Sequence, residues 1–327
     1  MMNKVIVTIT GAAGNIAYSL IFRILSGKIF PSDTKIQVNL LDITEALPIL
    51  KGVKYEIEDC AFESLSSILI TDKAEEAFID ADFILLMGAK PRTQGMQRAD
   101  LLLDNAHIFK NQGITINKCV KKETKIIVIG NPANTNALII QNFASNIPSE
   151  NITSLMRLDQ NRAKSVLSSK LNNDVESITK LIVWGNHSAT QYPDLSYALV
   201  DNRRESIENL DDKWIENNFI PRVQNRGAEI IEYRGKSSAA SAASAIYDHL
   251  NVLVNNSNDW QSMGIISDNS YNISNEIFFS FPLQLSNSKI NIINNLEVSE
   301  KSSTYLKNTE KELLSERDII KDILKGN

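Results

Sequence analysis

A histidine in the second half of the chain has the type and the place of a proton-transfer residue. His187 lies in the segment WGNHS (184–188), just beyond an apolar segment, and it is one of only three histidines. Imidazole titrates near neutral pH, so a histidine in a loop after a buried strand can exchange a proton with a bound substrate. His107 and His249 lie within helical patterns and are interpreted as ordinary surface or packing residues.

Asp159 and Arg162 add two groups of complementary chemistry. They stand three residues apart at a predicted helix start in LDQNR (158–162), a spacing that puts both on one face of the helix. An aspartate on the second ring nitrogen of a histidine would fix its tautomer and stabilise the imidazolium. Taken alone, His187 could as well be a residue that packs in a turn, so this hypothesis depends on the other sites.

A glycine-rich turn near the N-terminus has the composition of a phosphate-binding turn. It follows an apolar segment, opens into a helical pattern, and consists of Gly11, Ala12, Ala13, Gly14, Asn15, Ile16 and Ala17. Small residues let a pyrophosphate approach the backbone, and the free N–H groups of a helix N-terminus attract its charge. On this motif alone, a tight turn that binds nothing is the alternative.

Asp42 ends the second strand pattern of the same predicted βαβ unit. A carboxylate at this place can accept hydrogen bonds from the adenosine ribose of a dinucleotide. Its distance from the turn exceeds the usual spacing of ~20 residues, which the extra segment 27–34 explains. Because a carboxylate would also repel a 2′-phosphate, the pattern favours NAD over NADP as the cofactor.

An arginine-rich segment, KPRTQGMQR (90–98), follows the third predicted strand and carries Arg92 and Arg98. Open α/β sheets place their ligands at the carboxyl ends of their strands. The planar fork of arginine matches a carboxylate with two parallel hydrogen bonds, so this loop suits an anionic substrate. Gly95 also suits a lid that closes over the substrate. A solvated basic loop is the alternative for this segment taken by itself.

The first half of the chain alternates short apolar runs with longer amphipathic stretches. The runs at 4–10, 35–42, 82–89 and 125–131 are predicted to be buried parallel strands. The stretches at 17–25 and 101–120 are predicted helices. This order is typical of an α/β fold with a doubly wound parallel sheet.

The pattern changes after about residue 154. A long helix is predicted to begin near Asp159, followed by a strand at 181–185, helices at 222–235 and 237–256, and a surface helix in the tail at 299–325. We therefore predict two domains, a nucleotide-binding domain at 1–153 and a C-terminal α+β substrate domain at 154–327.

Composition narrows the function classes. Of 327 residues, 43% are hydrophobic and 22% charged, which is ordinary for a globular protein. The net charge of −5 and the lack of a basic run argue against a nucleic-acid partner. Cys60 and Cys119 have no metal-ligand spacing, and no apolar run approaches the ~20 residues of a membrane span. We expect no metal, no membrane partner and a cytoplasmic protein with reduced thiols.

These motifs together resemble the cytosolic-type malate dehydrogenases of the lactate/malate dehydrogenase family. The resemblance rests on TGAAGNIAYSL (10–20), LLDIT (40–44), PRTQGMQRADLL (91–102), GNPANTNAL (130–138), RLDQNRAK (157–164), WGNHSATQYPD (184–194) and SSAASAA (237–243). It extends from the first strand to the C-terminal helix. It implies a Rossmann fold, an NAD-dependent enzyme that interconverts malate and oxaloacetate, a dicarboxylate substrate and a homodimer.

The resemblance also implies a role for each site residue. His187 would be the proton acceptor and Asp159 its orienting partner. Four residues would bind the substrate: Arg162 at the carboxylate beside the reacting carbon, Arg92 at the distal carboxylate, Arg98 at the reacting oxygen, and Ser238 in the pocket wall. Asn131 would contact both substrate and nicotinamide, with Asn105, Gln112, Ile129 and Gly130 as further cofactor contacts.

Three alternatives differ from this interpretation in a testable feature. Lactate dehydrogenase, or another 2-hydroxy-acid dehydrogenase, shares the layout but needs no cation opposite the far end of its substrate, and Arg92 argues against it. A tyrosine-dependent short-chain reductase would need a Tyr-x-x-x-Lys pair, which no tyrosine here begins. A non-catalytic NAD-binding Rossmann module has no need of a complete set of proton-transfer and carboxylate-binding residues.

Overall fold

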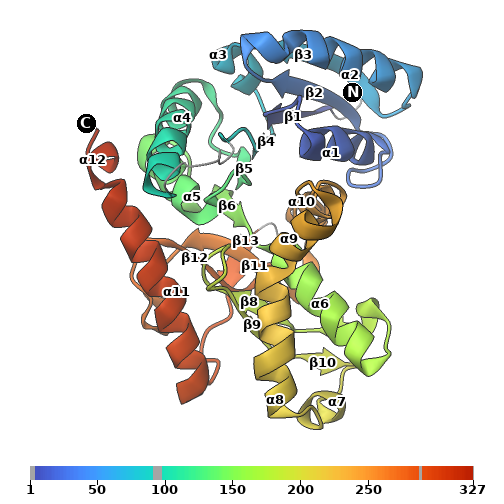
Figure 1. Cartoon of the computed structure of the whole chain (residues 1–327). Coiled ribbons are helices and arrows are strands. Elements are labelled where there is room, and N and C mark those ends of the chain that lie inside the picture. Colours follow the sequence, from blue (N-terminus) through green and yellow to red (C-terminus); the bar gives the residue numbers. More distant parts are fainter. Residues whose placement is uncertain (1–3, 91–97, 287–288, 327) are drawn as a thin grey trace. The chain divides into compact units, whose positions relative to one another are not determined.

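The computed structural model of the chain describes residues 4–90, 98–286 and 289–326, and of Arg98 only the backbone. By its internal contacts the chain divides into two compact units. The first comprises Met1–Ser154 and Ser315–Asn327, and the second comprises Leu155–Leu314. The C-terminal residues from Ser315 onward therefore group with the N-terminal unit. In Figure 1 this unit appears in blue and green, with the red end of the chain.

Six strands, all paired in parallel, form the sheet of the first unit in the order β3-β2-β1-β4-β5-β6. The order changes direction between β1 and β4, and this is where open α/β sheets bind their ligands. The predicted doubly wound parallel sheet is thus confirmed. The strands are β1 (Lys4–Thr10), β2 (Lys35–Leu41), β3 (Leu65–Thr71), β4 (Phe83–Leu86), β5 (Lys125–Val128) and β6 (Ile152–Leu155).

Helices bury their apolar stripes against this sheet. On α1, Leu20, Ile21 and Ile24 recur at helical spacing and are fully buried. Helices α4 and α5 pack side by side (Figure 1). The helices are α1 (Asn15–Leu25), α2 (Leu47–Asp59), α3 (Ala74–Phe78), α4 (Arg98–Cys119), α5 (Ala133–Phe143) and α12 (Lys321–Leu324), with single turns at Thr44–Ala46 and Ser149–Asn151.

The second unit combines antiparallel strands with helices, as the predicted α+β domain requires. Its three longer strands pair in the order β13-β12-β11, and β8 pairs with β9 and β7 with β10. The strands are β7 (Ile178–Thr179), β8 (Ile182–Trp184), β9 (Tyr192–Asp194), β10 (Leu199–Val200), β11 (Ser257–Ile266), β12 (Phe278–Ser286) and β13 (Lys289–Ile292).

Helix α6 packs against α9 and α10 in this unit. The core is aromatic, because Trp184, Phe278, Phe279 and Phe281 are all at most 1% exposed. The helices are α6 (Arg157–Leu171), α7 (Glu205–Glu208), α8 (Asp212–Trp214), α9 (Ile220–Arg234), α10 (Ala240–Asn255) and α11 (Glu300–Ile319), with a π-helical segment at Ile215–Phe219 and single turns at Val175–Ser177 and Ser270–Asn272.

Two properties of the described residues bear on the function. None of the helices in the described ranges combines the length and the hydropathy of a membrane-spanning segment. Within the same ranges, no group of three or more His, Cys, Asp or Glu side chains is arranged to hold a metal ion.

Candidate active site

The glycine-rich turn leads from β1 into α1 with the backbone geometry of a phosphate-binding turn. Gly11 has φ +63°, and a Cβ there would lie 2.7 Å from Cα of Gly88 on the neighbouring chain segment. A side chain at this position is therefore excluded both by conformation and by contact. Helix α1 begins at Asn15, after Gly14, without a side-chain cap. Its first N–H groups can therefore bind an anion.

Thr10 and Asp42 fix the two sides of this turn. The Thr10 hydroxyl accepts the N–H groups of Met87 and Gly88, both at 3.0 Å, and so holds the end of β4 beside β1. The Asp42 carboxylate accepts the N–H of Ala13 at 2.9 Å. The predicted ribose-binding residue therefore lies directly beside the turn, as its proposed role requires.

The segment after β5 contains the predicted cofactor contacts Ile129, Gly130 and Asn131. A Cβ on Gly130 would lie 2.9 Å from Cζ of Phe109, so the backbone here packs closely on α4. Asn131 is exposed and precedes Pro132 in a cis peptide bond. The Gly130 carbonyl accepts a hydrogen bond from the Asn136 amide at 2.8 Å, which attaches the segment to α5.

The Asn105 side chain binds backbone groups of the protein, whereas its predicted role is a contact with the cofactor. Its side chain is fully buried, its Oδ1 accepts the Lys90 N–H at 2.7 Å, and its Nδ2 lies 3.3 Å from the carbonyl oxygens of Lys90 and Asn131. Asn105 therefore joins the start of the arginine-rich segment to Asn131. A direct contact between Asn105 and the cofactor stays a prediction.

Gln112 lies on the same helix as Asn105, but its side-chain oxygen is unsatisfied. Its Oε1 is buried and has no hydrogen-bond partner among the described residues. An unsatisfied buried oxygen costs about 1–3 kcal/mol, so it indicates a missing polar partner. A bound polar ligand would satisfy this oxygen.

In the second unit, the predicted proton-transfer residues are brought together. His187 follows β8, and its Nδ1 contacts Oδ2 of Asp159 at the start of α6. Arg162, one turn further along α6, places its Nη1 3.3 Å from Oδ1 of Asp159. Asp159 is fully buried, whereas the His187 side chain is 17% exposed. His187 thus has one ring nitrogen on the aspartate and remains accessible.

The charges of His187 and Asp159 stabilise each other. Burial is the largest single influence on Asp159 and works against its ionisation, but His187 and Arg162 together hold the pKa of the carboxyl below its ordinary value. For His187, burial opposes the charged form, yet the charge and hydrogen bond of Asp159 raise the pKa above 6.5. The pair therefore favours an imidazolium facing a carboxylate.

Arg162 also has an unsatisfied group. Its side chain is only 12% exposed, and its buried Nε has no hydrogen-bond partner among the described residues. Because a guanidinium carries five N–H donors, the contact with Asp159 leaves donors for a second anion. A substrate carboxylate is the kind of ligand that would use them.

The remaining predicted substrate residues are less defined. Arg92 lies outside the described residues, and only the backbone of Arg98 is described, at the first residue of α4. Ser238 is half-exposed and lies just before α10.

Two glutamines that were not predicted from the sequence support the residues His187, Asp159 and Arg162. Gln160 donates to the carbonyls of Leu181 and Trp260 at 2.8 and 2.9 Å, and its Oε1 accepts the Ser262 N–H at 3.1 Å, so the start of α6 is attached to β11 and to the residue before β8. Gln191 is 2% exposed, and its side chain helps to lower the pKa of the Asp159 carboxyl. Both glutamines lie inside the recognised motifs, but their partners are distant in sequence.

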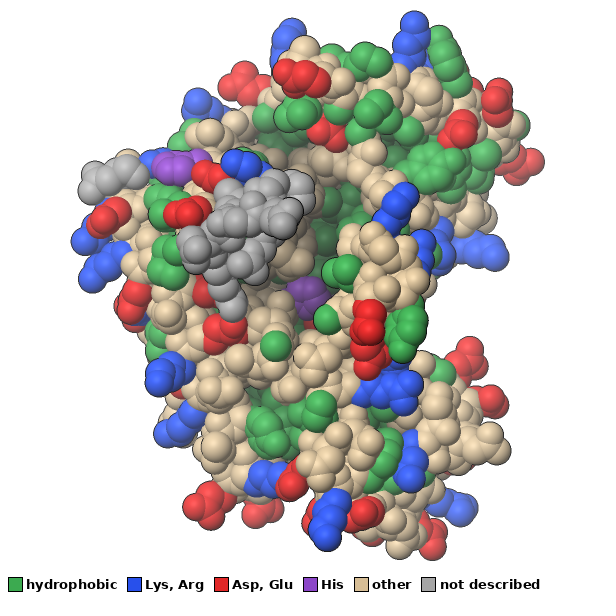
Figure 2. Space-filling model, viewed as in Figure 1, with side chains coloured by type: hydrophobic (Ala, Val, Ile, Leu, Met, Phe, Trp, Pro, Cys, Tyr) green, Lys and Arg blue, Asp and Glu red, His purple; other side chains and the backbone are tan. Residues whose placement is uncertain are grey.

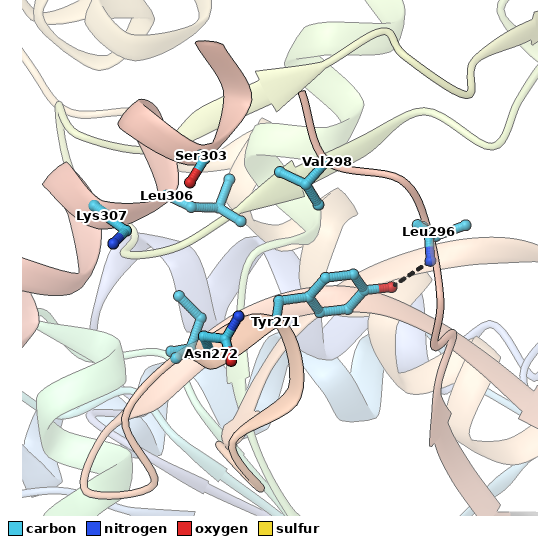
Figure 3. Close-up of a pocket in the computed structure, with 8 residues that line it drawn as sticks. Tyr271, Asn272, Leu296, Val298, Ser303, Leu306 and Lys307 are labelled. Atoms are coloured by element: carbon cyan, nitrogen blue, oxygen red, sulfur yellow. Dashed lines mark hydrogen bonds between the residues drawn. The ribbon is translucent and has the colours of Figure 1, made fainter. Parts of the chain in front are cut away.

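A separate pocket of about 290 Å³ lies elsewhere in this unit (Figure 3). None of the three proton-transfer residues lines it. Tyr271 closes one side, with its ring centroid 4.9 Å from that of Trp184 and its hydroxyl 3.4 Å from the Leu296 nitrogen. The tyrosine thus supports the strand that precedes His187. The lining residues are Tyr271, Asn272, Ile273, Leu296, Val298, Ser303, Leu306 and Lys307.

Comparison with known proteins covers nearly the whole chain. A family model described as the lactate/malate dehydrogenase NAD binding domain matches residues 5–153, and one described as the lactate/malate dehydrogenase alpha/beta C-terminal domain matches residues 156–323. Malate dehydrogenase from Naegleria fowleri is 41% identical over 98% of both chains, with a TM-score of 0.94. Trichomonas vaginalis lactate dehydrogenase in complex with NADH and oxamate is 36% identical over 99% of this chain and 100% of that chain, with a TM-score of 0.93.

The residues present fit the cofactor that these matches imply. The open N–H groups of α1, the Asp42 carboxylate beside the turn and the unsatisfied Gln112 oxygen are the groups that a dinucleotide would use. NAD is therefore the cofactor of the first unit. With the two matching domains and two relatives above 30% identity, the chain belongs to the lactate/malate dehydrogenase family and is an NAD-dependent 2-hydroxyacid dehydrogenase.

Proposed function

We propose that this member of the family is a malate dehydrogenase, which oxidises malate to oxaloacetate and reduces NAD. The contact between His187 and Asp159, with Arg162 one turn away, carries the proposal for the reaction itself. These three residues would thus belong to the substrate domain at 154–327, while residues 1–153 would bind NAD.

Each residue of the set has a chemical task in this proposal. His187 removes the proton from the substrate hydroxyl, because its Nδ1 contacts Asp159 and its side chain is 17% exposed. Asp159 then stabilises the imidazolium that forms. Arg162 binds the carboxylate beside the reacting carbon. A bound NAD would supply the hydride acceptor for that carbon. Arg98 would polarise the reacting oxygen.

Malate rather than lactate is proposed because of Arg92. A second carboxylate distinguishes malate from lactate, and a guanidinium is the side chain that best pairs with it. The 41% identity to a malate dehydrogenase supports this choice. The 36% identity to a lactate dehydrogenase keeps lactate as the second candidate.

Steady-state oxidation of NADH with oxaloacetate, with pyruvate or without an acceptor tests the proposal. We expect oxaloacetate to give a kcat/KM at least ~30-fold above that of pyruvate, because one desolvated charge pair is worth about 2 kcal/mol or more. Preference for pyruvate would identify the chain as a lactate dehydrogenase. Oxidation with neither acceptor, despite NADH binding, would support a non-catalytic NAD-binding module.

We also propose that the chain forms a homodimer through the face of the first unit that carries α1 and α2. Four large apolar side chains are exposed there or nearby, and hydrophobic side chains gather over this part of the unit in Figure 2. Phe22 of α1 contacts Phe62, which follows α2, with ring centroids 6.4 Å apart. The four exposed side chains are Tyr18, Ile43, Ile49 and Tyr55.

Sedimentation velocity tests this surface. Tyr18→Glu should shift the protein from dimer to monomer, because it introduces a charge into a buried apolar interface. Tyr233→Glu on α9, where the parent residue is 85% exposed, is the matched control and should leave the dimer intact. A dimer that withstands the change at Tyr18 would place the interface elsewhere.

A further inference from the structure

The loop that carries His187 is bound to α11 through one carboxylate. Oε2 of Glu312 lies 3.1 Å from Nδ2 of Asn186, 2.5 Å from the Ser188 hydroxyl and 2.5 Å from the Thr190 hydroxyl. These three residues surround His187 in sequence, on both sides. Glu312 itself is half-buried. A single oxygen atom therefore receives hydrogen bonds from most of the polar side chains of the loop.

Thr309, one turn before Glu312, completes this attachment. It is fully buried, and its hydroxyl accepts the backbone N–H of Asn186 at 2.9 Å. Gly185 has φ +93°, and a Cβ there would overlap the Thr309 side chain. The backbone directly before His187 thus lies against α11 at a distance that only glycine permits.

The hydroxyl groups of Ser188 and Thr190 both donate to Oε2 of Glu312. Ser188 accepts the Thr190 N–H at 3.1 Å, so its hydroxyl proton is available for the carboxylate. Thr190 has one hydroxyl proton, which the carboxylate attracts more strongly than the neutral Thr309 oxygen 3.0 Å away. The side-chain donors of Asn186, Ser188 and Thr190 thus meet on Oε2 of Glu312, and a carboxylate, which only accepts, suits all three.

We propose that Glu312 is a positioning residue that holds the 186–190 loop and thereby keeps His187 on Asp159 in the geometry for proton transfer. The proposal rests on the proposed role of His187 as the proton acceptor. A glutamine at this place keeps one acceptor oxygen but has no negative charge, so its hydrogen bonds to the three donors would be weaker. His187 would then lose its fixed position.

Kinetics of Glu312→Gln, with Glu310→Gln as the matched control, test the proposal. Glu310 lies on the same helix and accepts the Ser274 N–H at 2.7 Å, so it also holds a loop, but not the one with His187. A displaced catalytic group can cost on the order of 10²-fold in rate. We expect a loss of kcat near this size for Glu312→Gln, an unchanged Kd for NADH, and near-normal kcat for Glu310→Gln.

Titration of the His187 ring by NMR measures its pKa, which a loss of stability alone would not change. Asp159 raises the pKa of His187, and Arg162 lowers it. If the loop loosens, the influence of Asp159 weakens and the pKa falls. The His187 signal can be assigned by its loss in His187→Asn. Ser188→Ala removes one donor without changing the charge, so a downward shift in this variant too would exclude a purely electrostatic effect of Glu312.

The outcomes separate this proposal from the proposed function. If the wild-type protein reduces no 2-oxo acid but the His187 pKa falls in both variants, the positioning role stands and the enzymatic role fails. If the enzyme is active and Glu312→Gln retains kcat within twofold with an unmoved His187 pKa, the positioning role is overturned. Equal losses of kcat in Glu312→Gln and Glu310→Gln would overturn it as well. Ser188→Ala, a milder change, serves the same tests if Glu312→Gln does not fold.

Discussion

The Asp42 carboxylate accepts the Ala13 N–H through Oδ2 at 2.9 Å and the Ile43 N–H through Oδ1 at 2.8 Å. The residue predicted to select the cofactor is therefore also a structural part of the glycine-rich turn. A substitution at Asp42 acts in two ways. It weakens the turn for any dinucleotide, and it removes the negative charge that opposes a 2′-phosphate.

These two effects can be separated by comparing cofactors. The wild-type enzyme should prefer NADH to NADPH clearly. Asp42→Ala should lower kcat/KM for NADH and reduce the ratio between the two cofactors, because only NADPH gains from loss of the charge. Asp72→Ala is the control, since this aspartate follows the next strand and bonds to the Thr44 hydroxyl. Equal kcat/KM for NADH and NADPH in the wild type would contradict the assignment of Asp42.

Replacement of the proton acceptor should separate binding from turnover. His187→Asn should bind NADH with nearly unchanged affinity and lower kcat by roughly 10²–10⁴-fold, the usual contribution of general acid–base catalysis. Fluorescence titration with NADH and steady-state assays measure the two quantities. His107→Asn should change neither. Near-normal turnover in His187→Asn would remove this histidine from the mechanism.

The pH profile should depend on Asp159. Reduction of a 2-oxo acid needs protonated His187, so kcat/KM falls as the pH rises through the pKa of His187. Asp159 raises this pKa, which keeps the enzyme active to higher pH. In Asp159→Asn the fall should therefore occur at lower pH, with a lower maximal rate. A profile with the wild-type midpoint would show that Asp159 does not set the ionisation of His187.

Much of the fold could be predicted because the first unit obeys simple periodic rules. The run at 4–10 is a strand with those bounds. Other elements carry weaker signals. The β3 segment LSSILIT mixes polar and apolar residues. Its residues before Thr71 are either half-buried or exposed, so the segment lacks the continuous apolar run of a buried strand. β4 ends at Leu86 rather than continuing to 89, since the Met87 and Gly88 N–H groups bond to the Thr10 hydroxyl.

The candidate site was predictable to a similar degree. The meeting of His187 with Asp159 follows from motif types and is present in the structure. The attachment of the His187 loop to Glu312 could not be predicted, because the partners lie more than 120 residues apart and Glu312 looks like any exposed charge of a surface helix. His249, interpreted as a surface or packing residue, is a fully buried histidine.

The buried His249 should make the protein less stable in acid. Burial, with a smaller effect of Arg157, lowers the pKa of His249 from 6.5 to about 3. The unfolded chain therefore binds a proton that the folded chain does not, and stability falls as the pH drops from 6.5 toward 3. At about pH 5 the loss from this residue is about 2 kcal/mol.

Denaturant unfolding of His249→Leu and of the wild type, each at neutral pH and near pH 5, measures this effect. The difference in the free energy of unfolding between the two pH values should be smaller in the variant by about 2 kcal/mol. His187 and Asp159 titrate in both proteins, so their contribution cancels. Identical pH dependence of the two proteins would show that His249 is not the acid-sensitive group.

Substrate choice should depend on Arg92, whose guanidinium is proposed to pair with the carboxylate that distinguishes oxaloacetate from pyruvate. Arg92→Gln should lower kcat/KM for oxaloacetate by ~30-fold or more, since loss of one partner of a desolvated charge pair costs about 2–5 kcal/mol. Pyruvate has no second carboxylate and should lose far less, or gain. Arg162→Gln is the contrasting variant. Both substrates share the carboxylate that Arg162 is proposed to bind, so both should fall together. If Arg92→Gln instead lowers both substrates equally, Arg92 positions the loop or the cofactor, and malate loses its advantage over lactate as the proposed substrate.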